Sequence, residues 1–286
     1  MATLEIEGSS IYYVDEGSGR PTVFLHGIPT DFRAWDAQVR VFSKSRRAIS
    51  YSRRYASPNV REGDVSDSTV QNNAGDLKTL VAKLGTGAVD LVGHSYGGFV
   101  AAYFAANEPE LVRSLVLVEP AVSTMLVKNP NNPVELLTLL LGSPSVASSV
   151  SGFRSKALNP ALKALGEGKL ETSVELLSDG IQGEPGSLKR FPEGVRSMMK
   201  ENAKTIGELR TVFPVFVRSD CARIRCRTLV INGEQSPLWL RAIGDRMASS
   251  IPRSSKVNLA GARHFPHIEK AGEFNTCVLD FLSKES

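Results

Sequence analysis

The chain has 286 residues, 42% of them hydrophobic and 22% charged, which is enough apolar material for a sizeable core and excludes a disordered or low-complexity protein. The net charge of +4 is a small difference between 34 basic and 30 acidic residues that are scattered along the chain, so nucleic acid is not an expected partner. Three cysteines without a Cys-x-x-Cys pair favour the reducing cytoplasm, and no apolar run reaches the roughly 18 residues that cross a bilayer, so no membrane partner is expected.

The first 120 residues alternate between strand-like and helix-like patterns. The amino terminus lacks the positive start and apolar stretch of a secretory signal. Short or alternating apolar runs predict strands at 2–7, 10–14, 22–25, 46–51, 88–92 and 114–118, the first two forming a hairpin. Helical periodicity follows at 34–43, 69–84 and 97–107. This alternation is typical of an α/β protein with a parallel sheet and helices on both faces.

The alternation stops between residues 121 and 222, where leucine-rich helical stretches carry almost no β-branched runs. It resumes with strands at 228–231 and 256–259 and helices at 237–249 and 270–283. Because a single sheet is predicted on both sides of the gap, the middle stretch is interpreted as an insertion. We expect a core domain formed by 1–120 and 223–286, with 121–222 as a helical cap, or lid.

One turn carries the strongest chemical signal. Ser95 lies in the run Gly93-His94-Ser95-Tyr96-Gly97, directly after a predicted strand and before a predicted helix. A serine in this position needs small residues two positions away on either side, and its hydroxyl is lifted above the sheet. The amino end of the following helix favours negative charge there. Ser95 is therefore predicted to be a catalytic nucleophile.

Three landmarks in a fixed order show a family resemblance. They are His26-Gly27-Ile28-Pro29, the turn Gly93 to Gly97, and Gly261-Ala262-Arg263-His264, and each follows a predicted strand. The chain resembles the α/β-hydrolase family over its whole length. That resemblance implies a mostly parallel eight-stranded sheet with helices on both faces and an inserted helical lid. It also implies that the backbone N–H groups of Ile28 and Tyr96 form an oxyanion hole.

The general base is sought among four histidines. His26 belongs to the oxyanion loop, and the side chain of His94 is expected to point away from the adjacent nucleophile. In the family the base follows the last strand in a Gly-x-x-His pattern, which His264 matches. His267 is expected to be a polar residue at a helix start. His264 and His267 are three residues apart, but no carboxylate or cysteine cluster accompanies them as in a metal site. No metal and no cofactor are therefore expected.

The third member of a catalytic triad is not where the family usually has it. The family usually has an aspartate in the turn after the seventh strand, and this chain has Ser236 at that position. Glu119, at the end of the strand predicted at 114–118, is assigned as the acid instead, as in one branch of haloalkane dehalogenases and in zearalenone-type lactonases. Glu234 is the alternative, because it lies in the usual turn two positions early.

The remaining residues constrain the substrate weakly. Met125, Leu126 and Trp239 follow catalytic turns and either line a pocket or pack in the core. Arg53 and Arg54 lie after the fourth predicted strand, where relatives often carry a different motif. They either contact an acidic substrate or, as the preferred interpretation, form structural salt bridges.

Serine rather than aspartate at the nucleophile position favours acyl transfer. We expect hydrolysis of a small or medium apolar ester or lactone. A perhydrolase or haloperoxidase-like enzyme, a lyase, and a receptor with a vestigial triad are the alternatives. The oligomeric state is left open, a homodimer included.

Overall fold

The computed structural model describes residues 2–61, 63–129 and 132–284, and within them an eight-stranded sheet forms the centre of the protein. Its strands are β1 (Ala2–Ile6), β2 (Ser9–Glu16), β3 (Pro21–Leu25), β4 (Arg47–Tyr51), β5 (Val89–His94), β6 (Val112–Val118), β7 (Arg227–Gly233) and β8 (Ser254–Leu259). Their order across the sheet is β1-β2-β4-β3-β5-β6-β7-β8. β2 pairs antiparallel with both β1 and β4, and all pairs from β4 to β8 are parallel.

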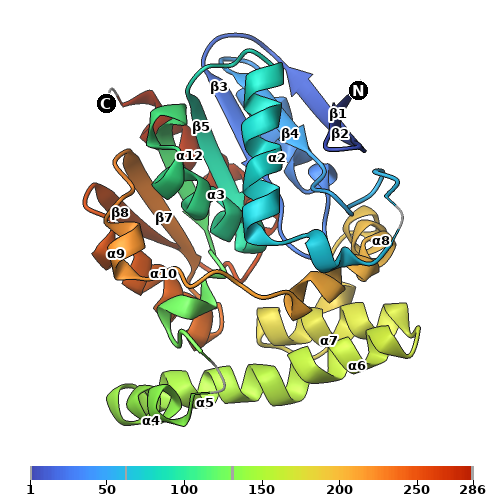
Figure 1. Cartoon of the computed structure of the whole chain (residues 1–286), viewed down its shortest axis with the longest axis vertical. Helices are drawn as coiled ribbons and strands as arrows, with labels where there is room; N and C mark the ends of the chain where they lie inside the picture. The colour runs from blue at the N-terminus through green and yellow to red at the C-terminus, as the bar shows by residue number, and fades with distance from the viewer. Residues whose placement is uncertain (1, 62, 130–131, 285–286) are drawn as a thin grey trace.

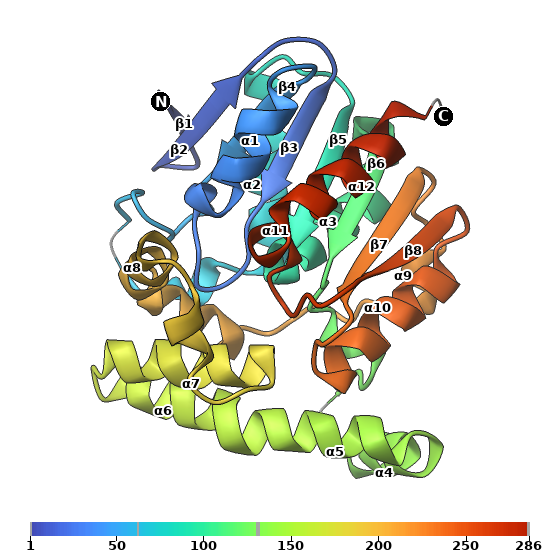
Figure 2. The same ribbon diagram turned by 180° about the vertical axis from the view of Figure 1, so that it is seen from behind.

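Helices cover both faces of the sheet, as predicted. α2 (Val70–Lys83) and α3 (Ser95–Asn107) lie in front of it in Figure 1. α1 (Asp36–Phe42) and α12 (Ala271–Ser283) lie on the opposite face, which Figure 2 brings forward. The remaining helices of the sheet region are α10 (Leu238–Ser250) and the short α11 (Pro266–Glu269). The inner strands β3, β5 and β6 are almost fully buried, because helices exclude water from both their faces.

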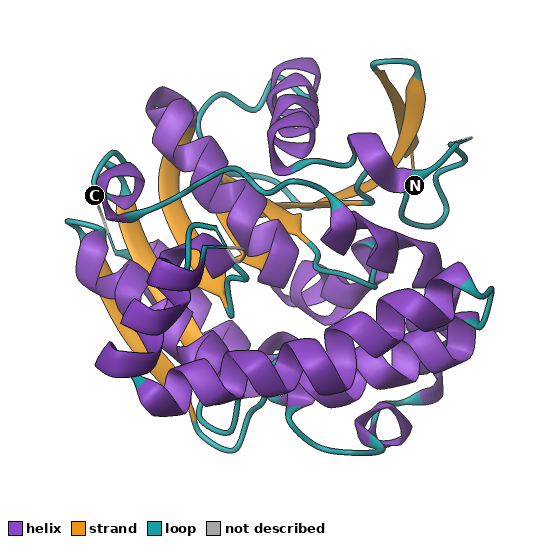
Figure 3. Cartoon of the chain, turned by 60° about the horizontal axis from the view of Figure 1, so that its bottom comes forward, coloured by secondary structure: helices purple, strands orange, loops and turns teal. Residues whose placement is uncertain are grey.

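The described residues between β6 and β7 form helices and connecting loops, and β6 and β7 themselves are paired neighbours. The helices are α4 (Pro133–Gly142), α5 (Pro144–Phe153), α6 (Asn159–Gly166), α7 (Leu170–Gln182), α8 (Glu193–Glu201) and α9 (Arg218–Cys221). We call residues 121–222 the inserted segment; its residues 130–131 lie outside the described residues. Figures 1 and 3 show α5, α6 and α7 together at one end of the molecule, beyond the sheet.

Two element boundaries differ from the sequence prediction in a way that matters for the site. The strand predicted at 88–92 continues to His94, and the helix predicted from 97 begins at Ser95, so no loop separates them. The helix predicted at 34–43 is a 3-10 turn (Phe32–Trp35) followed by α1. Among the described residues, no helix combines the length and the apolar character that spanning a bilayer requires.

Two glycines allow the turn after β5 to pack tightly. A Cβ atom on Gly93 would lie 2.5 Å from the carbonyl oxygen of Gly97. A Cβ atom on Gly97 would lie 2.5 Å from the carbonyl oxygens of Leu25 and His26, at the end of β3. Contacts of this length are far inside van der Waals separation, so only glycine brings α3 this close to β3 and β5.

We predict that Gly93→Ala lowers the free energy of unfolding by at least about 2 kcal/mol, because backbone atoms must move to make room for the methyl group. Gly75→Ala in α2 is the matched control, since a Cβ atom there meets nothing within 4 Å. That substitution should be neutral or stabilise by up to about 1 kcal/mol. Urea denaturation of both variants measures the difference, and equal effects would contradict the packing argument.

Candidate active site

Ser95 lies at the junction of β5 and α3 in a strained backbone conformation. Its φ of +52° is in the left-handed region, which residues with a side chain rarely adopt. The side chain is largely buried, with 8% of the residue exposed. Because α3 begins at this residue, its first N–H groups lack acceptors within the helix, and the positive end of the helix dipole lies beside the serine.

The imidazole of His264 connects Ser95 to a carboxylate. His264 Nε2 lies 3.0 Å from Ser95 Oγ, and Nδ1 lies 3.2 Å from Glu119 Oε2. With Glu119 ionised, Nδ1 carries the proton and donates to it, which leaves the lone pair of Nε2 to accept from the serine hydroxyl. The structure therefore brings together the three side chains that the sequence singled out.

Glu119 is completely buried immediately after β6. Its φ of +48° turns the backbone into the left-handed region, and its N–H donates to the carbonyl of Ile231 at 2.8 Å. Oε1 accepts a hydrogen bond from the backbone N–H of Gly233 at 2.5 Å, while Oε2 faces His264. Each carboxylate oxygen thus has one donor, as a buried charge requires.

The alternative acid lies elsewhere. Glu234 is exposed, and its Oε2 accepts from the backbone N–H of Gly261 at 3.0 Å, so this carboxylate holds the turn before the histidine and does not contact the imidazole. Ser236, at the place of the usual aspartate, is buried and its hydroxyl has no hydrogen-bond partner among the described residues. A serine there leaves the contact with the histidine to Glu119.

The loop after β3 passes close to the nucleophile. A Cβ atom on Gly27 would lie 2.9 Å from Ser95 Cβ, so this backbone is in direct contact with the serine. Ile28 follows in a cis bond to Pro29 and is buried. Tyr96, the second residue of α3, is also buried, and its N–H belongs to the first turn of the helix. Both predicted oxyanion donors therefore lie in segments that adjoin Ser95.

The fold agrees with the comparison to known proteins. A family model described as the alpha/beta hydrolase fold matches residues 21–271. The chain belongs to the α/β-hydrolase family.

Two relatives that match this α/β hydrolase over nearly its whole length are named as haloperoxidases. It is 36% identical over 282 residues to a non-heme haloperoxidase of Rhodococcus erythropolis, covering 96% of this chain and 97% of that one. It is 35% identical over 295 residues to the non-heme chloroperoxidase CPO-A1 of Kitasatospora aureofaciens, with 97% and 98% covered. The solved enol-lactonase of Burkholderia xenovorans LB400 has a TM-score of 0.66 at 18% identity, covering 99% of this chain and 100% of that one, which is a likeness of fold.

The other three histidines of this hydrolase hydrogen-bond to backbone groups or pack against aromatic rings. His26 Nδ1 donates to the carbonyl of Gly27 at 2.8 Å, and its Nε2 accepts from the N–H of Arg53, which supports the structural role predicted for it. His94 Nε2 donates to the carbonyl of His264 at 2.7 Å. His267 lies in the first turn of α11, at a helix start as predicted; it is fully buried, and its ring stacks on Trp35 at 4.3 Å.

Arg53 and Arg54 form buried salt bridges, as preferred from the sequence. Arg53 Nη1 lies 2.7 Å from Glu208, and both side chains are fully buried. The same guanidinium donates to the carbonyl of His26 at 3.1 Å and lies over the ring of Tyr96. Arg54 pairs with Asp76 at 2.6 Å and with further carboxylates. Arg53 therefore connects the loop after β3 and the start of α3 to the inserted segment, which contributes Glu208.

Gln182 is a site residue that sequence reasoning missed. It is the last residue of α7 in the inserted segment and is buried. Its Oε1 accepts from the backbone N–H of His264 at 2.8 Å, and its Nε2 donates to Glu269 at 2.7 Å. Arg263 reinforces the contact, donating to the carbonyl of Gln182 at 3.0 Å. No motif surrounds Gln182, so nothing in the sequence could indicate this contact.

Two cavities have linings that do not include the triad. Met125 and Leu126 line a cavity of about 740 Å³, and Trp239 lines another of about 350 Å³. Neither lining contains Ser95 or His264. Met125 and Trp239 are also largely buried, so each side chain is part of the core and part of a cavity wall.

The buried histidines predict how stability depends on pH. Burial, and secondarily the proximity of His264, lowers the pKa of His267 to about 3, whereas an exposed imidazole titrates near about 6.5. Between these values the unfolded chain binds a proton at this position that the folded chain does not. The free energy of unfolding therefore falls as the pH drops below about 6.5, by about 2 kcal/mol at pH 5 for this group alone.

We predict that His267→Phe, which can keep the ring stacked on Trp35, removes this part of the pH dependence. Urea denaturation at about pH 8 and about pH 5 should show a decline that is about 2 kcal/mol smaller in the variant than in the wild type. His26 and His94 remain buried in both proteins, and burial is the main cause of their lowered pKa values. The same decline in both would contradict the prediction.

Proposed function

We propose that this α/β hydrolase cleaves a small or medium-sized apolar carboxylic ester or lactone through an acyl-serine intermediate. The observation that carries the proposal is the hydrogen-bonded chain from Ser95 Oγ through His264 to Glu119. A hydroxyl bonded to an imidazole that is itself oriented by a buried carboxylate is the arrangement that activates serine for attack on a carbonyl.

Acylation would proceed as follows. Ser95 Oγ attacks the carbonyl carbon while its proton moves to His264 Nε2, and the carbonyl oxygen becomes an oxyanion. The backbone N–H groups of Ile28 and Tyr96 would donate to this oxygen, and one such donor contributes about 3 kcal/mol to transition-state stabilisation. Glu119 stabilises the imidazolium. The intermediate then expels the alcohol oxygen, which takes the proton from His264.

Deacylation repeats these steps with water as the nucleophile. His264 accepts a proton from the water, whose oxygen attacks the acyl carbon. The second tetrahedral intermediate releases the carboxylic acid, and the proton returns to Ser95 Oγ. In a lactone the alcohol stays attached to the acyl group, so the product is a hydroxy acid.

The inserted segment would act as the lid over this site. α7 carries Gln182, and its apolar residues Val174, Leu177 and Ile181 are buried in the hydrophobic core. An apolar cover favours an apolar substrate, because a charged or strongly polar group would lose hydration beneath it without a matching partner.

Perhydrolysis is the second candidate, and the names of the full-length relatives favour it. Hydrogen peroxide can replace water in attacking the acyl-serine, which releases a peroxy acid and restores the serine. A peroxy acid oxidises halide ions, so the same acyl-enzyme could support a haloperoxidase reaction. Esters assayed with and without peroxide distinguish the candidates, because only a perhydrolase forms peroxy acid from the acyl-enzyme.

A serine-directed fluorophosphonate tests both candidates at once. The proposal requires stoichiometric labelling at Ser95 in the wild type and none in Ser95→Ala. A panel of p-nitrophenyl esters and lactones of increasing chain length then defines the acyl pocket. A folded wild type that never labels would exclude any mechanism that uses an acyl-serine.

We predict that Glu119→Gln lowers kcat by about 10³-fold or more, because a neutral amide neither fixes the imidazole tautomer nor stabilises imidazolium. Glu234→Gln is the matched control and should change kcat by less than about twofold, since only an exposed bond to a loop N–H is weakened. Ester hydrolysis by both purified variants, with circular dichroism to confirm folding, gives the ranking. The opposite ranking would assign the acid to Glu234.

Gln182 would act as a positioning residue for the base. Gln182→Met keeps the approximate length of the side chain but cannot bond the N–H of His264, so the imidazole loses part of its orientation. We expect kcat to fall by about 10- to 100-fold with a smaller change in KM. Gln235→Met on the neighbouring exposed turn is the control and should behave like the wild type. A loss in thermal stability with unchanged kcat would show that Gln182 serves folding alone.

A further inference from the structure

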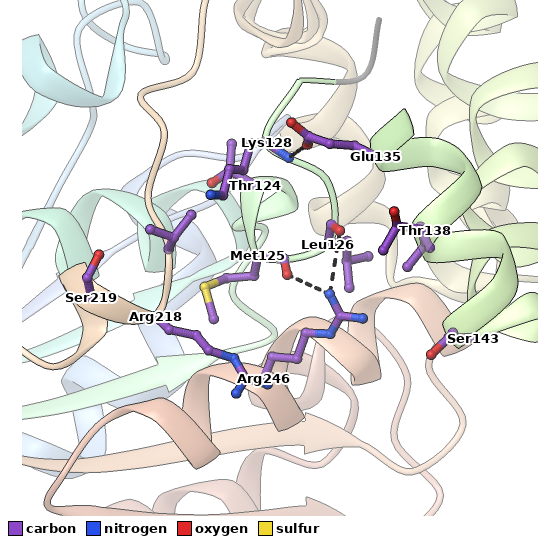
Figure 4. A pocket seen from close by; sticks show the side chains of 13 residues that line it. Thr124, Met125, Leu126, Lys128, Glu135, Thr138, Ser143, Arg218, Ser219 and Arg246 are labelled. Carbon is purple, nitrogen blue, oxygen red and sulfur yellow. Dashed lines mark hydrogen bonds between the residues drawn. The ribbon is translucent and has the colours of Figure 1, made fainter. Parts of the chain in front are cut away.

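The cavity of about 740 Å³ is formed where the inserted segment meets α10, and the mechanism above does not use it. Figure 4 shows its lining side chains, which come from the 3-10 turn Ser123–Met125, from α4, from α9 and from α10. Its volume is in the range of small-molecule sites. Because Ser95, Glu119 and His264 are absent from the lining, a ligand here would not be at the nucleophile.

Cations dominate the charged groups of the lining. The lining contains three cationic residues, Arg218, Arg246 and Lys128, and a single carboxylate, Glu135. That carboxylate already accepts from the backbone N–H groups of Lys128 and Asn129, at 2.7 and 3.1 Å. Glu135 is therefore engaged in holding the loop before α4. The cavity keeps an excess of positive charge.

The two arginines lie close together without a carboxylate between them. Arg246 Nη1 donates to the carbonyl of Met125 at 2.7 Å, which fixes its guanidinium on the cavity wall, as Figure 4 shows. Among the described residues, no carboxylate oxygen lies within ion-pairing distance of either guanidinium. Burial and then repulsion by Arg218 lower the pKa of Arg246. An anion bound between the two would relieve this repulsion.

The rest of the lining is apolar. Met125, Leu126 and Leu139 contribute hydrocarbon and thioether surface beside the guanidinium groups, and Val217 lies next to Arg218. An inorganic anion would leave this surface exposed to water, whereas a ligand with a hydrocarbon part would cover it. A planar guanidinium binds carboxylate and phosphate oxygens with two parallel hydrogen bonds.

We propose that this cavity is a second ligand site, which binds a small amphiphilic anion. Its carboxylate or phosphate monoester group would pair with Arg218 and Arg246, and its hydrocarbon part would lie against Met125, Leu126 and Leu139. The site is separate from the proposed ester hydrolysis and does not depend on it.

Isothermal titration calorimetry with octyl phosphate, octanoate and uncharged 1-octanol tests the site. The titrations use Ser95→Ala, so that turnover at the nucleophile cannot contribute heat. We expect at least one of the two anions to bind with a stoichiometry of one, at least about tenfold more tightly than 1-octanol. Binding should weaken with added salt. The tighter of the two anions identifies the head group as carboxylate or phosphate.

Variants of single arginines locate the bound anion. Arg218→Gln, added to Ser95→Ala, should weaken anion binding at least about tenfold. Arg225→Gln is the matched control, because this exposed arginine lies just beyond α9 and outside the lining, and it should leave binding within about twofold. Absence of saturable anion binding, or binding that Arg218→Gln leaves unchanged, would overturn the proposal.

Discussion

The Glu119 carboxylate is buried at the end of β6, and its two oxygen atoms join three separate turns of the protein. One oxygen accepts from the N–H of Gly233 after β7, and the other faces the His264 imidazole after β8. The next residues return toward the nucleophile, since the N–H of Ala121 donates to the carbonyl of Ser95. A buried charge is tolerated only with such partners, so the three turns must hold their relative positions for this fold to be stable.

The inserted segment extends this constraint to the rest of the site. Gln182 bonds the backbone of His264, and Glu208 pairs with Arg53, which in turn holds the carbonyl of His26 and covers the ring of Tyr96. Both the loop of the base and the loop beside the nucleophile therefore contact side chains from between β6 and β7. Movement of this segment would therefore disturb the His264 loop and the segments of the proposed oxyanion donors together.

Much of the fold and site could be predicted from the sequence because the relevant signals are local. The alternation of apolar runs and helical periods gave the strands and helices, with errors at boundaries such as the start of α3, where strand and helix meet at Ser95 without a loop. His267 lies at a helix start as predicted, but the sequence did not indicate its burial. A histidine at a helix start is usually solvated, and only packing of α11 against Trp35 buries this one.

The sequence by itself determined which residue types stand at each strand end: a serine between two glycines, a histidine after the last strand, and a glutamate in place of the usual acid. Only the tertiary structure decided between Glu119 and Glu234 as the neighbour of His264, and only it revealed Gln182. The physical reason is that a turn motif constrains backbone and chemistry within a few residues. A hydrogen bond across 82 or 145 positions depends on how the elements pack.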